Sequence, residues 1–299
     1  MEKKFIDPST VRKDIIVKEK LELLDDFPIF SIVEFNLFGN CNRNCSFCPV
    51  SDTSFYKKTK DAISVELYEK IMQDLASIKY KGKLLYSAFC EPLLHKKIEE
   101  LIFLSKKYLP NCRVEIVSNG DLITTKKLKK LFEAGLDTIS ISMYDGPHQI
   151  LHFENMMNEA NLTKEQVILR RRYFDGDNFG ITISNRAGLI DSNQYRDKNE
   201  QKIIDLPLKS NCFYPFYMTL IDYNGDMLLC PHDWKKTTVI GNLATNNIWN
   251  LWKDGKKLNT IRKMLSNENR NFTPCKTCDV IGTVIGKGSF EKWKVLSIK

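Results

Sequence analysis

The sequence lacks the features of a membrane or secreted protein. No apolar stretch approaches the ~18 residues that a helix needs to cross a bilayer. The residues from Met1 to Asp14 include basic side chains but have no apolar core behind them, so a secretory signal is not expected. We therefore expect a cytoplasmic protein with reduced thiols and no membrane partner.

Internal repeats, low-complexity tracts and the signature of a disulfide framework are also missing. The chain has nine cysteines, an odd number that cannot form a complete set of pairs. Nine cysteines are nevertheless many for 299 residues in a reducing compartment. Ligation of a metal or an iron–sulfur cluster explains them better than pairing does.

The positive charge is not concentrated in one patch. The formal net charge is +8, which suits an anionic ligand such as a phosphate group. The lysines are scattered from Lys57-Lys58 to Lys256-Lys257, and only Arg170–Arg172 form a compact basic run. Scattered lysines favour a solvated surface over a nucleic-acid groove, so no nucleic-acid partner is expected.

Strand-like and helical runs alternate between residues 29 and 185. A clear helical stripe follows Ser64, a favourable N-cap residue. Such alternation predicts right-handed βα units around a parallel sheet. Six units are too few for an eight-fold barrel, so we expect an α/β fold with a partial (β/α)6 TIM-like barrel over residues 28–200. Its working face should lie at the carboxyl ends of the strands. The expected strands are Ser31–Leu37, Lys83–Phe89, Arg113–Ser118, Thr138–Met143, Gln166–Tyr173 and Gly180–Ser184.

The pattern changes after residue 200. Asn224-Gly225 is a strong hairpin signal between two short apolar runs. A helical stretch near Ile248–Met264 and a cysteine-bearing loop follow. We expect residues 201–299 to form a separate small α+β module. Residues 1–27 are expected to be a helical or irregular extension.

Three cysteines directly follow the first expected strand. Cys41, Cys45 and Cys48 have the spacing Cys-x3-Cys-x2-Cys. A structural zinc site normally has four ligands, and no nearby cysteine or histidine completes this set. Three thiolates on a four-iron cluster would leave one iron open to another ligand. A small zinc or cysteine knot on an unrelated α/β fold remains the alternative.

This segment resembles the cluster-binding motif of the radical S-adenosylmethionine (SAM) superfamily, including the aromatic Phe47 before the last cysteine. The segment Ser87–Leu93 resembles the family's Gly-Gly-Glu segment, although Cys90 replaces the glycine before Glu91. Later segments, Val117–Gly120 and Ser140–Ser142, resemble two further signatures in the expected order. The resemblance implies that SAM binds the open iron of a 4Fe–4S cluster. It assigns SAM contacts to Phe47, Glu91, Ser118, Asn119 and Ser142.

A second set consists of Cys212, Cys230, Cys275 and Cys278. It resembles the SPASM domain of many radical SAM enzymes, in the shortened form called twitch, because Val284 occupies the place of the next cysteine. The resemblance implies a second, fully ligated 4Fe–4S cluster that accepts or relays electrons. A four-cysteine structural zinc is the competing interpretation.

The resemblance implies an enzyme that uses a 5′-deoxyadenosyl radical to abstract hydrogen from a C–H bond. The similar enzymes are of the 2-deoxy-scyllo-inosamine dehydrogenase type and the sugar-epimerase type. We expect oxidation of a secondary alcohol of a carbohydrate or cyclitol, with or without a phosphate. In Ser184–Gly188, Arg186 is the candidate for steering the substrate or assisting deprotonation, unless it is only a surface arginine. Cys90 could return a hydrogen atom in an epimerase, or could simply be a small residue.

Two other functions are less favoured. A peptide-modifying SPASM enzyme often has a recognition domain before the barrel, but only 40 residues precede Cys41. A non-catalytic iron–sulfur carrier would not need the SAM-binding segments. The expected partners are a small-molecule substrate and a flavodoxin- or ferredoxin-type electron donor.

Overall fold

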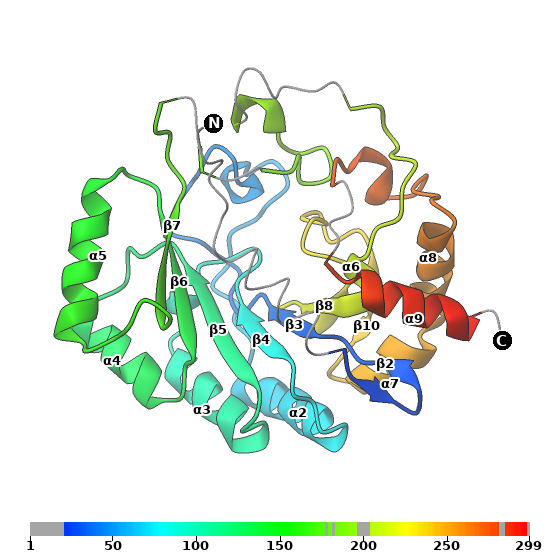
Figure 1. Ribbon diagram of the computed structural model, residues 1–299, viewed down its shortest axis with the longest axis horizontal. Coiled ribbons are helices and arrows are strands. Elements are labelled where there is room, and N and C mark those ends of the chain that lie inside the picture. Colours follow the sequence, from blue (N-terminus) through cyan, green and yellow to red (C-terminus); the bar gives the residue numbers. More distant parts are fainter. Residues whose placement is uncertain (1–20, 177–178, 181–182, 196–203, 281–284, 298–299) are drawn as a thin grey trace.

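One eight-stranded sheet organises the molecule (Figure 1). The computed structural model describes residues 21–176, 179–180, 183–195, 204–280 and 285–297. The strands are β3 (Ile32–Phe35), β4 (Lys83–Tyr86), β5 (Arg113–Ser118), β6 (Thr138–Met143), β7 (Val167–Arg171), β8 (Met218–Ile221), β9 (Asp226–Leu228) and β10 (Val239–Asn242). Their order is β10-β9-β8-β3-β4-β5-β6-β7. The strands from β8 to β7 are parallel, and β9 and β10 are antiparallel additions. The sheet is therefore open, as expected.

Helices connect the parallel strands and cover one face of the sheet. They are α2 (Val65–Ser77), α3 (Ile98–Tyr108), α4 (Thr125–Glu133) and α5 (His148–Glu159). The expected start of α2 is confirmed, because the Ser64 hydroxyl accepts the Leu67 N–H at 3.1 Å. Ile71 and Leu75 of α2 are fully buried. Burial of such an apolar stripe against the sheet is the main source of stability for an amphipathic helix.

The other face of the sheet carries buried polar residues beside a small apolar cluster. Residues alternate between the two faces along each strand. Val33 and Phe35 of β3 therefore pack under the helices, whereas Glu34 between them is directed to the opposite face. That face also holds a buried ion pair of Lys83 and Glu115, with their charged atoms 3.0 Å apart. The pairing of these two residues satisfies their charges inside the protein.

The sixth parallel strand comes from a different segment than expected. Residues 181–182 lie outside the described part of the chain, and Gly180, Ile183 and Ser184 are not in a strand. The edge of β3 is instead paired with β8, with Ile32 opposite Met218. The prediction of six strands before residue 200 was therefore wrong for the last one. The boundary near residue 200 stays a prediction, since residues 196–203 are outside the described residues.

The carboxyl-terminal part confirms the predicted hairpin. Asn224-Gly225 connects β8 to β9, and Gly225 has φ +89°, a left-handed value that favours glycine. The predicted single helix is instead α7 (Ile248–Asp254) and α8 (Lys256–Ser266). At Gly255 between them, an added Cβ would lie 2.2 Å from the Leu251 carbonyl oxygen. The close backbone approach explains why a glycine is needed at this break. Two further helices are α6 (Tyr214–Tyr217) and α9 (Lys287–Ser297).

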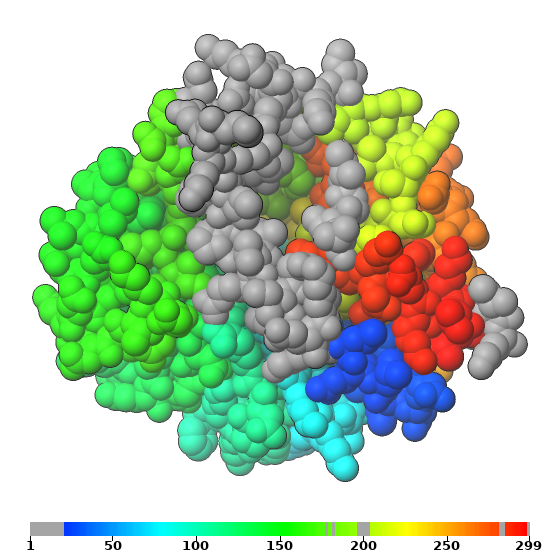
Figure 2. All heavy atoms as spheres, in the orientation of Figure 1, coloured from blue at the N-terminus to red at the C-terminus, as the bar shows by residue number. Residues whose placement is uncertain are grey.

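The amino-terminal extension is partly a hairpin. Strands β1 (Leu23–Leu24) and β2 (Phe27–Pro28) pair antiparallel, so the prediction of a helical or irregular segment was wrong for these residues. Residues 1–20 lie outside the described part. The hairpin (blue) lies against α9 (red) in Figure 2. The indole N–H of Trp252 also donates to the Pro28 carbonyl at 2.8 Å. None of the described helices is long and apolar enough to cross a membrane.

Candidate active site

A cavity of about 120 Å³ lies at the carboxyl ends of β3, β4 and β5. The expected first-cluster cysteines Cys41, Cys45 and Cys48 line it. Most of the other predicted site residues are in the same wall. They are Phe47, Cys90, Glu91, Ser118 and Asn119. The fold therefore brings together residues that are up to 78 positions apart in the sequence.

The three thiols share one half-buried environment. Burial raises the pKa of the Cys45 thiol to about 12, and the neighbouring Cys48 and Cys41 sulfurs raise it further. The amine of Lys58 holds the loop by donating to the Cys41 carbonyl at 3.0 Å. A cationic iron core would supply the positive charge that three thiolates need, with release of their protons. The donor set therefore fits a cluster with one open iron.

Glu91 is buried directly after β4. Its carboxylate accepts hydrogen bonds from the Leu93 N–H at 3.1 Å, the Ser118 hydroxyl at 2.8 Å and the Asn119 N–H at 2.7 Å. Burial raises the pKa of Glu91 to about 7, because its effect exceeds that of the hydrogen bonds. A carboxylate held in this way can accept hydrogen bonds from an amino group in the cavity.

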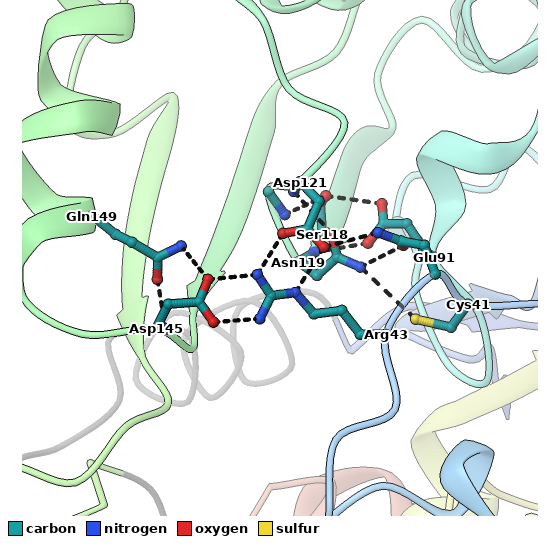
Figure 3. Close-up of polar contacts among 10 residues, drawn as sticks. Cys41, Arg43, Glu91, Ser118, Asn119, Asp121, Asp145 and Gln149 are labelled. Atoms are coloured by element: carbon teal, nitrogen blue, oxygen red, sulfur yellow. Dashed lines mark hydrogen bonds and ion pairs between the residues drawn. The ribbon is translucent and has the colours of Figure 1, made fainter.

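Asn119 connects the cysteine loop to β5. Its side-chain amide donates to the Asn42 side-chain oxygen at 2.8 Å and lies 3.8 Å from the Cys41 sulfur (Figure 3). The backbone N–H of Asn119 is already used by Glu91. One residue therefore orients both the carboxylate and the first cysteine.

Arg43 is a site residue that the sequence reasoning missed. Its guanidinium donates to both carboxylate oxygens of Asp121 at 2.5 and 2.7 Å and to both of Asp145 at 2.6 and 2.7 Å (Figure 3). It also lies 5.0 Å from the ring centre of Tyr144. The two aspartates follow β5 and β6, so Arg43 ties the cysteine loop to two strand ends. An arginine inside the motif, with an aspartate after each of two strands, was the available signal.

Aromatic side chains close one end of the cavity. The ring of Phe47 stacks on Tyr144, with centroids 5.7 Å apart, and contacts Phe179 and Tyr195 by their edges. Ser142 is buried on β6 and is not in the cavity wall. It lies instead within hydrogen-bonding reach of Tyr144. The structure thus places the predicted Ser142 behind the wall rather than in it.

The second cysteine set converges from three separate segments. Burial raises the pKa of Cys230, and the nearby thiols of Cys275, Cys278 and Cys212 raise it further. No three His, Cys, Asp or Glu side chains in the described ranges are placed to hold a single metal ion. The four thiols nevertheless affect one another's charge, and their number and type match the donor set of a fully ligated iron–sulfur cluster.

Arg270 is buried beside this second set. It is 2% exposed and donates to the carbonyls of Ser210 at 2.9 Å, Asn211 at 2.6 Å and Val280 at 2.7 Å. These carbonyls flank the segments that carry Cys212 and Cys278. The guanidinium therefore fixes both segments and supplies a positive charge where thiolates would gather.

Arg186 lies in a loop that is bonded to the segment of the second cysteine set, where the Asn185 N–H donates to Asp279 Oδ1 at 2.8 Å. Burial raises the pKa of Cys48 in the first set, and the Arg186 guanidinium counteracts that rise. Burial also raises the pKa of Tyr214 beside Cys212, and Arg186 again counteracts the rise. The side chain is half-buried, so it is not a free surface arginine.

The two remaining cysteines have different positions. Cys112 is 2% exposed, directly precedes β5 and donates to the Tyr80 carbonyl at 3.5 Å. It therefore lies at the end of the sheet opposite the cavity, as predicted. Cys90 is in the cavity wall, and its thiol lies 3.6 Å from the Ser87 carbonyl oxygen.

Family models identify both parts of the site. Residues 35–170 match the radical SAM superfamily, and residues 212–279 match an iron–sulfur cluster-binding SPASM domain. The chain therefore has a radical SAM domain and a SPASM domain. Its first domain binds a 4Fe–4S cluster and SAM, and its SPASM domain binds an auxiliary iron–sulfur cluster.

Comparison with individual proteins shows which radical SAM enzymes the chain resembles. The chain is 27% identical over 253 residues to the S-adenosyl-L-methionine-dependent 2-deoxy-scyllo-inosamine dehydrogenase of Niallia circulans, covering 84% of this chain and 93% of the relative. It is similar to the crystal structure of BtrN in complex with AdoMet and 2-DOIA, with a TM-score of 0.69 and 25% identity, over 85% of this chain and 95% of that one. A structure of anSMEcpe with bound AdoMet shares the fold, with a TM-score of 0.51 and 12% identity, over 90% of this chain and 97% of that one. The protein is a radical SAM oxidoreductase.

Proposed function

We propose that this protein is a dehydrogenase that oxidises a secondary alcohol of a carbohydrate or cyclitol to a ketone. The observation that carries the proposal is that the Arg186 loop is bonded to the segment of the auxiliary cysteines, where the Asn185 N–H donates to Asp279 Oδ1 at 2.8 Å, while the guanidinium acts on Cys48 of the first set. A second cluster near the reacting group could accept the electron that leaves the substrate radical. The similarity to a 2-deoxy-scyllo-inosamine dehydrogenase supports this reading.

The reaction must remove two electrons and two protons in total. A hydrogen atom leaves the alcohol carbon, a proton leaves its oxygen and one further electron leaves the resulting radical. When bound, SAM and the first cluster supply the acceptor of the hydrogen atom, and the auxiliary cluster supplies the acceptor of the electron. The ligands of the first cluster would be Cys41, Cys45 and Cys48. Those of the second would be Cys212, Cys230, Cys275 and Cys278.

The chain's own residues hold the reactants. We assign to Glu91 the role of accepting hydrogen bonds from the amino group of SAM's methionine moiety. Ser118 and Asn119 orient the Glu91 carboxylate for this contact. Phe47, stacked on Tyr144, keeps water from this end of the cavity, and Ser142 supports Tyr144 from behind. By holding SAM and the substrate in a fixed orientation, the protein lowers the barrier to hydrogen abstraction.

Arg186 is the proposed group for the substrate hydroxyl. Its guanidinium would orient the oxygen and stabilise the negative charge that develops as the proton leaves. A guanidinium has donor atoms only, so Arg186 acts here as an electrostatic group that assists deprotonation. A flavodoxin or ferredoxin in the cytoplasm would supply the electron that the first cluster needs.

Epimerisation of a sugar carbon is the second candidate. It rests on the Cys90 thiol in the cavity wall, which could return a hydrogen atom to the substrate radical. A carrier without catalysis is set aside, because the chain has a SAM-binding domain.

The test is turnover of 2-deoxy-scyllo-inosamine by reduced, fully reconstituted protein with SAM. We expect one ketone for each 5′-deoxyadenosine, and no ketone from Arg186→Gln with the same iron content. If 5′-deoxyadenosine forms at the uncoupled rate with this substrate and a panel of sugars and cyclitols, and no ketone appears, the dehydrogenase proposal fails.

A further inference from the structure

The loop that carries Arg186 is bonded to the loop that carries two auxiliary cysteines. The Asn185 N–H donates to Asp279 Oδ1 at 2.8 Å, and the Asp279 N–H donates to Asn185 Oδ1 at 3.2 Å. We call this reciprocal pair the Asn185–Asp279 clasp. It joins residues 94 positions apart, directly before Arg186 and directly after Cys278.

Three further hydrogen bonds reinforce the clasp. The Asn185 side-chain amide donates to the Thr277 carbonyl at 2.8 Å, and the Thr277 hydroxyl donates to the Ala187 carbonyl at 2.7 Å. The Ser192 hydroxyl donates to Asp279 Oδ2 at 2.9 Å. Asp279 is 5% exposed and its bond with Ser192 is buried, whereas the two bonds of Thr277 lie at the surface. Buried hydrogen bonds to a charged group are among the stronger ones in proteins.

The backbone between the bonded residues is strained. Arg186 and Ala187 have φ values of 49° and 56°, and Gly188 has φ 89°. Residues with a Cβ adopt this left-handed conformation rarely, and it persists only where the surroundings hold it. The clasp and the Thr277–Ala187 bond bracket the two strained residues. They act together with the turn's own bonds, in which the N–H groups of Gly188, Leu189 and Ile190 donate to the Asn185 carbonyl oxygen.

The other side of the clasp lies in the auxiliary site. Thr277 is between Cys275 and Cys278, and Asp279 follows Cys278. A four-cysteine cluster constrains the backbone of this segment when it binds. We propose that the clasp couples the auxiliary site to Arg186, so that occupation of the four cysteines sets the position of the arginine and Asp279 acts as its positioning residue. The importance of Arg186 itself rests on the proposed function. The coupling is a property of the loops alone.

Hydrogen exchange of the fully reconstituted protein tests the coupling without any substrate. Loss of the auxiliary cluster in a Cys275→Ala/Cys278→Ala variant should speed exchange in residues 185–190 at least tenfold. Exchange in β5 should stay as in wild type, which shows that the variant is folded. An unchanged rate in residues 185–190 would overturn the proposal.

Variants of the clasp test the same link from both sides. Asp279→Ala should speed exchange in residues 185–190 with wild-type iron content, whereas Asp279→Asn keeps an acceptor oxygen and should restore the slow rate. Asp191→Ala is the matched control, because Asp191 is exposed in the same loop and bonds its neighbours Asn193 and Gln194.

The reverse effect must also exist, because coupling between two sites is reciprocal. Asn185→Ala should shift the midpoint potential of the auxiliary cluster and leave that of the first cluster unchanged. A purely structural clasp predicts no shift. If wild-type protein binds no auxiliary cluster, the proposed function fails, while the exchange of Asp279→Ala and Asp279→Asn still decides whether the clasp holds the loop.

Discussion

The Glu91 carboxylate accepts a hydrogen bond from the Asn119 backbone N–H at 2.7 Å. The turn after β5 therefore orients the carboxylate that follows β4. The Ser118 hydroxyl adds a second contact from the same turn. These donors hold the carboxylate in the cavity wall at a place where burial opposes its charge. The amino group of a bound ligand would donate a further hydrogen bond to this carboxylate and stabilise its charge.

We predict that Glu91→Gln weakens SAM binding about tenfold or more. The change removes the charge from one hydrogen bond, and such bonds contribute roughly 1.5–3 kcal/mol. Equilibrium dialysis of reconstituted protein measures the affinity, and iron content should stay unchanged. Glu99→Gln on the outer helix α3 is the control. An unchanged affinity would show that Glu91 does not contact SAM.

The affinity for SAM should also depend on pH in a defined direction. Burial raises the pKa of Glu91 to about 7 in the ligand-free protein, and SAM needs the ionised form. Below pH 7 a proton must leave before SAM binds, so the affinity should fall by up to about tenfold per pH unit. Above pH 8 it should be constant. Glu91→Gln should be flat over this range, and a parallel slope in the variant would assign the pH dependence to another group.

Iron content tests the two cysteine sets independently. Anaerobic reconstitution should give about eight irons per chain, and the Cys41/Cys45/Cys48 triple alanine variant about four. That variant should not cleave SAM. The Cys275→Ala/Cys278→Ala variant should retain some cleavage without productive oxidation. Wild-type protein that saturates at four irons with bound zinc would contradict the two-cluster model.

Arg270 should be needed for the auxiliary cluster. Arg270→Ala leaves three carbonyls without their donor, and each buried unsatisfied group costs about 1–3 kcal/mol. We expect a lower midpoint of denaturant unfolding and loss of the auxiliary iron. Arg270→Lys should recover only part of it, because an ammonium cannot reach three carbonyls in fixed directions. The exposed Lys263→Ala in α8 serves as control, and wild-type iron content in Arg270→Ala would refute the role.

Oxidation and epimerisation differ in the fate of solvent deuterium. We predict that turnover in deuterium oxide gives a ketone without deuterium at the reacting carbon, in wild type and in Cys90→Ala alike. This expectation follows from treating Cys90 as a small residue in the wall. Deuterium at an inverted carbon, lost in Cys90→Ala, would instead establish an epimerase. Mass spectrometry of the product distinguishes the two results.

Local patterns predicted the parts of the fold that depend on neighbours in sequence. The start of α2 at Ser64 and the bounds of β5 and β6 needed only a capping residue or a buried apolar run. The pairing of β3 with β8 could not be predicted in this way, because nothing near Ile32 indicates which distant strand will cover its edge.

The same distinction applies to the site. Cysteine spacing and the family resemblance identified residues whose role depends on type and position in the chain. Arg43 was missed because its function depends on Asp121 and Asp145, which only the folded sheet brings to it. The Asn185–Asp279 clasp was missed for the same reason, because only the fold brings together two residues that are 94 positions apart.

The pairing of β3 with β8 also constrains how the chain can be made. During synthesis β3 leaves the ribosome long before β8 exists, so its hydrogen-bonding edge stays bare while most of the protein is translated. Contacts between distant segments slow folding, and an uncovered edge strand invites pairing with other chains. The nascent chain therefore has a long interval of exposure, in which a chaperone that covers the β3 edge would favour correct folding.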